Sequence, residues 1–181
     1  MPSRSRIIAI PGSLSRNSVN LSLIRSIISI FSDRLDIKVI EGLADIPHFN
    51  PDLNNDNPPE NVSNFRRQLK QADGILICTP EYAMGVPGTL KNAIDWTVSS
   101  MEFSHKPVAL ITASTAGQKG HQSLINTLKI IEADMPDDSQ LLISHVKAKV
   151  KDDKIIAPET LQQIKKLIGS LINSIAMVQT S

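Results

Sequence analysis

Residues 79–96 read TPEYAMGVPGTLKNAIDW, and this stretch decides the expected fold of the chain. It follows the apolar run at residues 74–78, which has the length and composition of a buried central strand. Proline fixes φ and glycine tolerates backbone geometry or close approach that other residues resist, so a stiff loop is expected at Pro80, Gly85, Pro87 and Gly88. The residues that then recur at helical spacing are Leu90, Ala93, Ile94 and Val98. The loop therefore lies at the carboxyl end of a strand, where open α/β sheets bind ligands.

The same alternation of strand and helix occurs five times along the chain. Short, mainly apolar runs predict strands at residues 7–10, 107–113 and 141–143, and a weak apolar/polar alternation predicts one more at residues 36–40. Apolar residues at helical spacing follow each strand and predict helices, beginning near Leu21, Val62, Leu124 and Leu161. The pattern predicts one α/β domain over residues 1–181. We expect a flavodoxin-like three-layer sandwich, with a five-stranded parallel sheet in the order 2-1-3-4-5 and helices on both faces.

Composition excludes several classes of protein. A formal net charge of +1 over 181 residues gives no basic surface for nucleic acid, and no apolar run reaches the roughly 18 residues of a membrane span. The single cysteine, Cys78, excludes an internal disulfide and is expected to be a small core residue, so cytoplasmic placement is the default. The four histidines lack metal-ligand spacing with cysteine or acidic residues, so no metal site is expected.

The loop after the first strand, residues 12–20, combines hydroxyl groups, a cation and the start of a helix. Its polar residues are Ser13, Ser15, Arg16, Ser18 and Asn20. A helix N-terminus offers free N–H groups and a positive dipole end, so the loop suits a phosphate group. The alternative is an ordinary capped helix start, because serine and asparagine favour that position. Neither of the glycine-rich patterns GxxxxGK[ST] and GxGxxG occurs here.

Two further loops are expected beside this one. Tyr82, the only tyrosine, lies with Pro80, Glu81 and Met84 in the loop after the central strand, where a planar ligand could rest. Small residues end the fourth strand and would let backbone N–H groups approach a ring edge, at Ser114, Thr115 and Gly117. The alternatives are a tyrosine packed at a strand end and a plain turn between strand and helix. Three such loops at neighbouring strand ends favour one ligand site.

Residues 41–59 form a long segment rich in asparagine, aspartate and proline. Loops of this length are uncommon unless they bind, cover something or are disordered. The segment carries Phe49 and Leu53, and we expect it to cover a neighbouring subunit or the rim of the ligand.

Two of these stretches resemble the motifs of the NADPH-dependent FMN reductase family, which includes quinone, chromate and azo reductases of flavodoxin-like fold. GSLSRNSVN resembles the family's phosphate loop GSxRxxSxN, and PEYAMGVPGTLKNAIDW resembles its flavin loop PEYNxxxPGxLKNAIDW. The resemblance extends over residues 7–143. It implies phosphate-loop positions for Ser13, Ser18 and Asn20, isoalloxazine contacts for Pro80, Glu81 and Tyr82, and a pyrimidine-edge contact for Ser114 and its neighbours. Ser15 stands where many members have arginine, with Arg16 next to it, and Ala83 stands where many have asparagine.

The resemblance implies an FMN-dependent NAD(P)H oxidoreductase. Hydride would pass from NADPH or NADH to bound FMN and then to a quinone-like or other small acceptor, by a ping-pong mechanism. The cofactor carries this chemistry, so no catalytic side chain is expected from the protein. The family also implies a homodimer or homotetramer. The alternatives are a flavodoxin-type electron carrier without its own nicotinamide turnover and a nucleotide-binding α/β protein.

Overall fold

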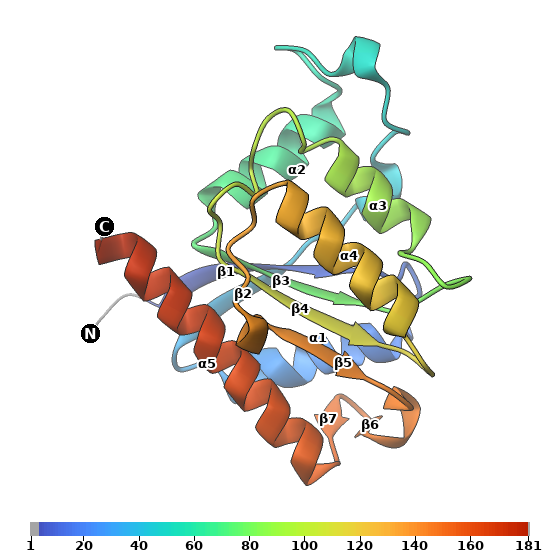
Figure 1. The fold of residues 1–181 in the computed structure, drawn as a ribbon, viewed down its shortest axis with the longest axis vertical. Helices are drawn as coiled ribbons and strands as arrows, with labels where there is room; N and C mark the ends of the chain where they lie inside the picture. Colours follow the sequence, from blue (N-terminus) through green and yellow to red (C-terminus); the bar gives the residue numbers. More distant parts are fainter. Residues whose placement is uncertain (1–3, 181) are drawn as a thin grey trace.

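The computed structural model describes residues 4–180, which form a parallel five-stranded sheet in the order β2-β1-β3-β4-β5 (Figure 1). The strands are β1 (Ser5–Pro11), β2 (Leu35–Val39), β3 (Gly74–Thr79), β4 (Val108–Ala113) and β5 (Gln140–Ile143). Every residue of β3 and β4 is buried, which explains why their sequences are mainly apolar rather than alternating. The predicted sheet topology is confirmed.

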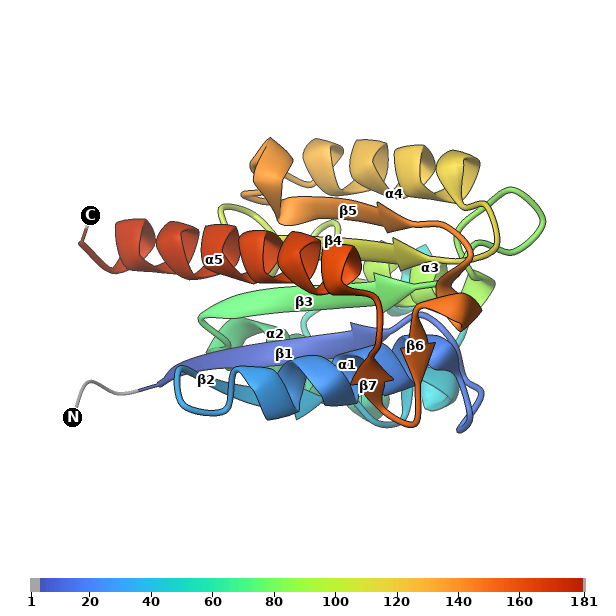
Figure 2. The same cartoon turned by 90° about the horizontal axis from the view of Figure 1, so that it is seen from below.

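Helices cover both faces of the sheet, so the protein has three layers (Figure 2). One face is covered by α1 (Val19–Ile30) and α5 (Pro158–Thr180), and the other by α2 (Glu60–Gln71), α3 (Gly88–Asp95) and α4 (Gln118–Ile130). Successive residues of a strand point to opposite faces. In β1, Ile8 and Ile10 pack with α2, α3 and α4, whereas Ile7 and Ala9 pack with α1 and α5.

The helix α3 is shorter than its sequence pattern suggests. Apolar residues at helical spacing predicted a helix that reaches Val98. The helix ends at Asp95 and Val98 is exposed, so this part of the prediction was wrong. The guanidinium group of Arg66, from α2, donates to the carbonyl oxygen of Trp96 at the end of α3. That carbonyl would otherwise accept the N–H of the next helical turn. Lys91 and Asp95 are four residues apart on this helix and form an ion pair, with the Lys91 Nζ 2.5 Å from the Asp95 Oδ1.

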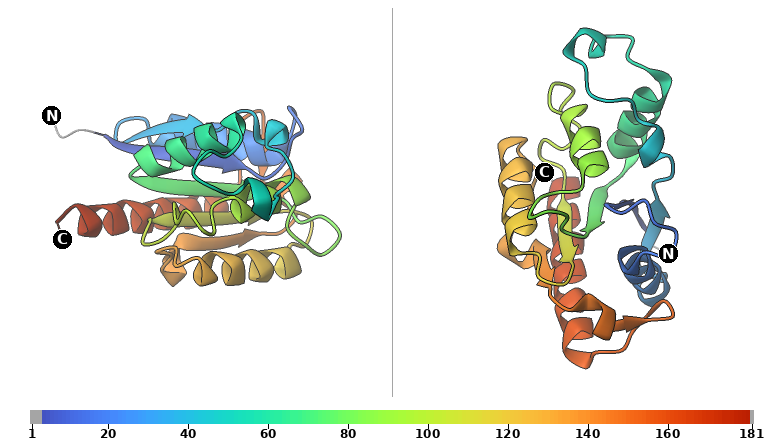
Figure 3. Two further views of the ribbon diagram at one scale, coloured as in Figure 1. Left: turned by 90° about the horizontal axis from the view of Figure 1, so that it is seen from above. Right: turned by 90° about the vertical axis from the view of Figure 1, so that its right-hand side faces the viewer.

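The segment at residues 41–59 projects from the body of the protein (Figure 3). It contains two short 3-10 helices, η1 (Leu43–Asp45) and η2 (Pro51–Leu53). Its base is anchored on α3, because Trp96 donates its indole N–H to the Pro47 carbonyl at 2.8 Å and the Phe49 ring packs edge-on against Trp96. The Asn92 side chain accepts from the Phe49 N–H at 2.8 Å. The segment is thus an ordered arm, hereafter called the 41–59 arm.

A small hairpin follows β5 and leads into α5. Its strands are β6 (Val150–Lys151) and β7 (Lys154–Ile155), preceded by η4 (Val146–Ala148), while η3 (Asp137–Ser139) precedes β5. The two strands are joined by a turn at Asp152 and Asp153, which have φ of 48° and 56°. The hairpin rests on α1, where Arg25 and Asp153 form an ion pair at 3.4 Å.

Two findings concern what the described residues lack. Within residues 4–180 no helix is long and apolar enough to span a bilayer. In the same range, no group of three or more histidine, cysteine, aspartate or glutamate side chains is arranged to hold a metal ion.

Candidate cofactor-binding site

The loops that follow β1, β3 and β4 meet at the carboxyl edge of the sheet. The Gly12 N–H donates to the Cys78 carbonyl at 2.9 Å and ties the first loop to the end of β3. The hydroxyl groups of Ser13 and Tyr82 are 3.2 Å apart. These strands are neighbours in the sheet, so the expectation that the three loops lie together is confirmed.

The loop after β1 presents hydrogen-bond donors. Ser13 is buried, Ser15 and Arg16 are exposed, and Ser18 is the N-cap of α1, accepting the Asn20 N–H at 3.2 Å. The first turn of α1 contains no acidic residue. A groove of about 560 Å³ separates this loop from residues 39–45, and its walls also carry Arg25, Glu41 and Asp45. Serine hydroxyls, an arginine and a helix N-terminus fit a phosphate group, while the two carboxylates belong to the opposite wall.

Asn20 lies beneath the loop rather than at its surface. It is 2% exposed, its amide donates to the Ala113 carbonyl at 3.2 Å, and its oxygen accepts from the Cys78 thiol at 3.4 Å. The side chain therefore ties α1 to the ends of β3 and β4. The family resemblance implies a phosphate-loop position for Asn20, and the Asn20 side chain lies beneath that loop.

Glu81 connects the loop after β3 to the start of α4. Its carboxylate accepts the Gly120 N–H at 2.5 Å. The N-cap of α4, Gly117, has no side chain that could cap the helix, so Glu81 supplies that cap from another loop. A Cβ at Gly120 would lie 3.0 Å from the Gly85 carbonyl oxygen, so the glycine permits this close packing. Sequence reasoning missed Gly120, whose only signal is a glycine just inside a predicted helix.

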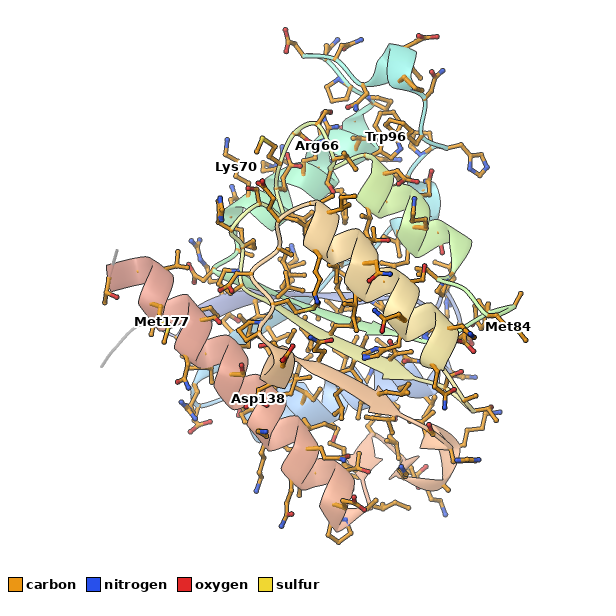
Figure 4. All side chains as sticks on the ribbon, viewed as in Figure 1. Arg66, Lys70, Met84, Trp96, Asp138 and Met177 are labelled. Atoms are coloured by element: carbon orange, nitrogen blue, oxygen red, sulfur yellow. The ribbon has the colours of Figure 1, made fainter. Side chains whose placement is uncertain are left out.

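The tip of the same loop is a tight turn at residues 82–85. Tyr82 and Gly85 exchange two backbone hydrogen bonds of 3.1 and 2.9 Å. Ala83 and Met84 between them have φ of 48° and 61°, a geometry that favours asparagine and glycine. Tyr82 is 54% exposed, and Met84, which is 75% exposed, lies at the outer edge of the molecule (Figure 4).

The glycines of this stretch do not have the role expected from the sequence. Among the described residues only Gly42 and Gly117 are glycines with positive φ. Apart from its chain neighbours and the backbone of its own helix, nothing within residues 4–180 lies within 4 Å of the place where a Cβ on Gly88 would be. The special conformations belong instead to Ala83 and Met84, because the turn closes around them.

Ala83→Asn should raise the free energy of unfolding by about 1 kcal/mol, because a non-glycine residue in the left-handed region costs roughly 1–2 kcal/mol and asparagine reduces that cost. For a chain of this size the melting temperature should rise by about 2–4 °C. Ala116→Asn is the matched control, since Ala116 is exposed in the neighbouring loop without positive φ. A lower melting temperature for Ala83→Asn would contradict the strain argument.

The loop after β4 is fixed against the end of β5. The Ser114 N–H donates to the Ile143 carbonyl at 3.1 Å, and the Thr115 carbonyl accepts from the His145 N–H at 3.2 Å. Gly117 has φ of 103°, and a Cβ there would lie 2.7 Å from the Leu142 side chain. Glycine is thus required at Gly117 both by conformation and by space.

Two titratable groups lie below the loops. The His121 Nδ1 is 2.8 Å from the Thr112 hydroxyl, and burial lowers the pKa of His121, so the imidazole is neutral at pH 7. Burial also raises the pKa of the Cys78 thiol, which stays protonated. The expectation that Cys78 is a core residue is confirmed.

This parallel sheet, with a donor-rich loop at its switch point between β1 and β3, defines a flavodoxin-like protein with a site suited to a phosphate-bearing ligand. Comparison with known sequences also identifies the family of the chain. Residues 5–148 match the sequence model of the NADPH-dependent FMN reductases, and the chain belongs to that family.

Curated relatives agree with this placement, and a solved structure has the same fold. A quinone reductase of Escherichia coli (strain K12) is 34% identical over 117 residues, which are 63% of this chain and 62% of the relative, so the match spans under two thirds of that protein. An NAD(P)H-dependent FMN reductase of Pseudomonas aeruginosa is 32% identical over 170 residues, covering 87% of this chain and 90% of the relative. The flavoenzyme NAD(P)H:(acceptor) oxidoreductase FerB of Paracoccus denitrificans has the same fold, with a TM-score of 0.78, 24% identity and coverage of 96% and 98%.

Proposed function

We propose that this protein is an FMN-dependent NAD(P)H oxidoreductase that reduces a quinone-like or other small acceptor. The observation that carries the proposal is the joining of three loops at adjacent strand ends. Ser13 bonds to Tyr82 and Glu81 bonds to Gly120, so the three loops form a single site. One end of this site presents hydrogen-bond donors that suit a phosphate group. Membership of the NADPH-dependent FMN reductase family supports FMN, which carries such a group, as the ligand.

The residues have separate tasks in this proposal. The phosphate would be held by the N-terminus of α1 and by the side chains of Ser13, Ser15, Arg16 and Ser18. The ring would lie against the backbone of residues 80–84 and 114–117, while Asn20 and Glu81 keep these loops in place. When bound, FMN supplies the hydride-transfer chemistry. The protein then has to bind, orient and shield, which needs no acid or base from a side chain.

The proposal is tested by adding FMN to the purified protein and recording the flavin absorption spectrum. FMN should shift the spectrum and raise the melting temperature, and it should bind more tightly than FAD. If the nicotinamide and the acceptor use one site in turn, steady-state rates with NAD(P)H and a benzoquinone should give parallel double-reciprocal lines. Absence of any spectral or thermal response to FMN would overturn the proposal, and intersecting lines would overturn the shared site. An electron carrier would bind FMN without sustained NAD(P)H oxidation.

The assembly we propose is a homodimer or a homotetramer in which a second copy covers the 41–59 arm. The support is a group of exposed apolar side chains at Phe49, Leu53, Val98 and Met101. The Asn54 amide donates to the Ser99 hydroxyl at 2.8 Å, which holds the arm beside the segment that carries Val98. Burying such side chains contributes about 25 cal/mol per Å² of apolar area.

Light scattering at micromolar concentration should give a mass of at least twice the 19.8 kDa of one chain. Leu53→Asp should shift the mass toward that of one chain. Ile130→Asp, a change at an exposed apolar residue on α4, is the control and should leave the mass unchanged. A wild-type protein with the mass of a single chain would contradict the assembly.

A further inference from the structure

A pair of hydroxyl groups joins the two ends of the proposed site. The hydroxyls of Ser13 and Tyr82 are 3.2 Å apart, and the Ser13 oxygen also accepts the Ser15 N–H at 3.3 Å. Ser13 is 7% exposed, so water has little access to its side chain. A buried hydroxyl at the phosphate end is therefore bonded to a residue of the ring-binding loop.

The hydrogen-bonding capacity of Ser13 limits how the pair can be arranged. A serine hydroxyl has one proton to donate and two lone pairs that accept. One lone pair takes the Ser15 N–H. If Ser13 donates to Tyr82, no proton is left for a ligand. If Tyr82 donates to Ser13, the Ser13 proton is free for an anion. A phosphate oxygen, which accepts, is therefore compatible with Ser13 only when Tyr82 is the donor.

The backbone of Tyr82 lies at one end of the tight turn at residues 82–85. Its N–H and carbonyl exchange hydrogen bonds with Gly85, and the two residues between them have positive φ. Tyr82 is more than half exposed, so packing alone does little to hold its side chain. The bond to Ser13 is thus a main restraint on the side chain that begins the strained turn.

We propose that Tyr82 is a positioning residue that couples anion occupancy at Ser13 to the conformation of the ring-binding loop. A phosphate group at Ser13 selects the arrangement in which Tyr82 donates, and hydrogen bonds in such a chain strengthen one another. Part of the preference for a phosphorylated over an unphosphorylated flavin then depends on Tyr82, which acts through Ser13. The identity of the natural ligand, a phosphorylated flavin, rests on the proposed function. The coupling between Ser13 and Tyr82 does not, because any phosphate group could produce it.

The coupling can be measured without a flavin, because Tyr82 is the only tyrosine and Trp96 the only tryptophan. The protein is labelled at both rings, and inorganic phosphate is added to saturation while their NMR signals are recorded. The Tyr82 signals should shift, and those of Trp96, buried at the end of α3, should not. No shift of Tyr82 in the wild type would overturn the proposal.

Two serine variants separate coupling from simple binding. Ser15→Ala keeps the N–H that donates to Ser13, so it should need more phosphate but still show the Tyr82 shift. Ser13→Ala should abolish the shift at any phosphate concentration. An equal Tyr82 shift in Ser13→Ala would mean that phosphate acts on Tyr82 by another route, and the proposal would be wrong.

Flavin binding supplies an independent test. Tyr82→Phe keeps the ring and should weaken FMN about three- to tenfold, the effect of one hydrogen bond, while riboflavin binding changes less than about twofold. The double variant Ser13→Ala/Tyr82→Phe should bind FMN no more weakly than Ser13→Ala. Additive losses, or equal losses for FMN and riboflavin, would overturn the coupling.

The same measurements separate failure of the coupling from failure of the proposed function. If FMN binds and Tyr82→Phe matches the wild type, the proposed function survives and the coupling fails. If Tyr82 responds to phosphate but the protein does not bind FMN, the coupling survives and the proposed function fails.

Discussion

Gly12→Ala is expected to lower the melting temperature by roughly 4–10 °C and to weaken FMN binding more than about tenfold. A Cβ at Gly12 would lie 2.0 Å from the Thr79 hydroxyl oxygen and 2.9 Å from the Thr79 Cα. The second distance is to backbone, which no rotation of a side chain can relieve. Either β3 or the loop after β1 must therefore move.

The movement would reach the site directly. Gly12 immediately precedes Ser13, and its N–H bonds to the Cys78 carbonyl at the end of β3. A shift of this segment displaces the loop that would hold the phosphate from the loop that would hold the ring. Overpacking in a well-packed region costs about 1–3 kcal/mol in stability. The measurements are thermal unfolding without ligand and an FMN titration followed by flavin absorption.

Gly88→Ala is the matched control. Gly88 belongs to the predicted flavin loop, yet among the described residues a Cβ added there would meet open space. It begins α3, where alanine is a better helix former than glycine. We expect its melting temperature to be unchanged or slightly higher, with FMN binding retained. If Gly12→Ala behaves like Gly88→Ala, the close approach of Gly12 to Thr79 does not constrain the site.

Arg16→Ala should weaken FMN binding by about tenfold to a hundredfold while riboflavin binding barely changes. A flavin phosphate carries close to two negative charges at neutral pH. A charge-assisted hydrogen bond to it contributes roughly 1.5–3 kcal/mol. Arg16 is exposed, and among residues 4–180 its guanidinium has no protein partner, so it is available to a ligand. The loss should shrink at high salt, because exposed charges are screened.

The control is Arg25→Ala. Arg25 borders the same groove but already pairs with Asp153 at 3.4 Å, so its removal should affect FMN binding less. Equal losses for FMN and riboflavin in Arg16→Ala would mean that the substitution disturbs the loop. Unchanged binding of both would mean that hydroxyls and backbone N–H groups hold the phosphate without Arg16.

The topology was predictable because it depends on patterns that are local in sequence. Residues 74–78 and 107–113 are mainly apolar without a regular alternation, and strands covered on both faces are the ones that bury every residue of such runs. Five alternations of strand and helix then leave few ways to arrange a parallel sheet. The meeting of the three candidate loops was also predictable, because turn residues after β1, β3 and β4 fall at one edge of that sheet.

Contacts between residues that are distant in sequence required the tertiary structure. Glu81 caps a helix 39 residues away, and the Asn20 amide reaches a carbonyl 93 residues away. Neither partner has a local signal, because each depends on the register of the strands and on the exact length of the loops between them. The early end of α3 has the same origin, since Arg66 comes from another helix.

The sequence by itself therefore determined the order of the strands, the two covered faces and the set of loops at the candidate site. The tertiary structure decided what each side chain in those loops does. Glu81 bonds to α4, Asn20 lies inside the protein, and the turn places its strain on Ala83 and Met84 rather than on glycine. The physical reason is that periodicity and turn chemistry act over a few residues, whereas a hydrogen bond of about 3 Å depends on the placement of the whole sheet.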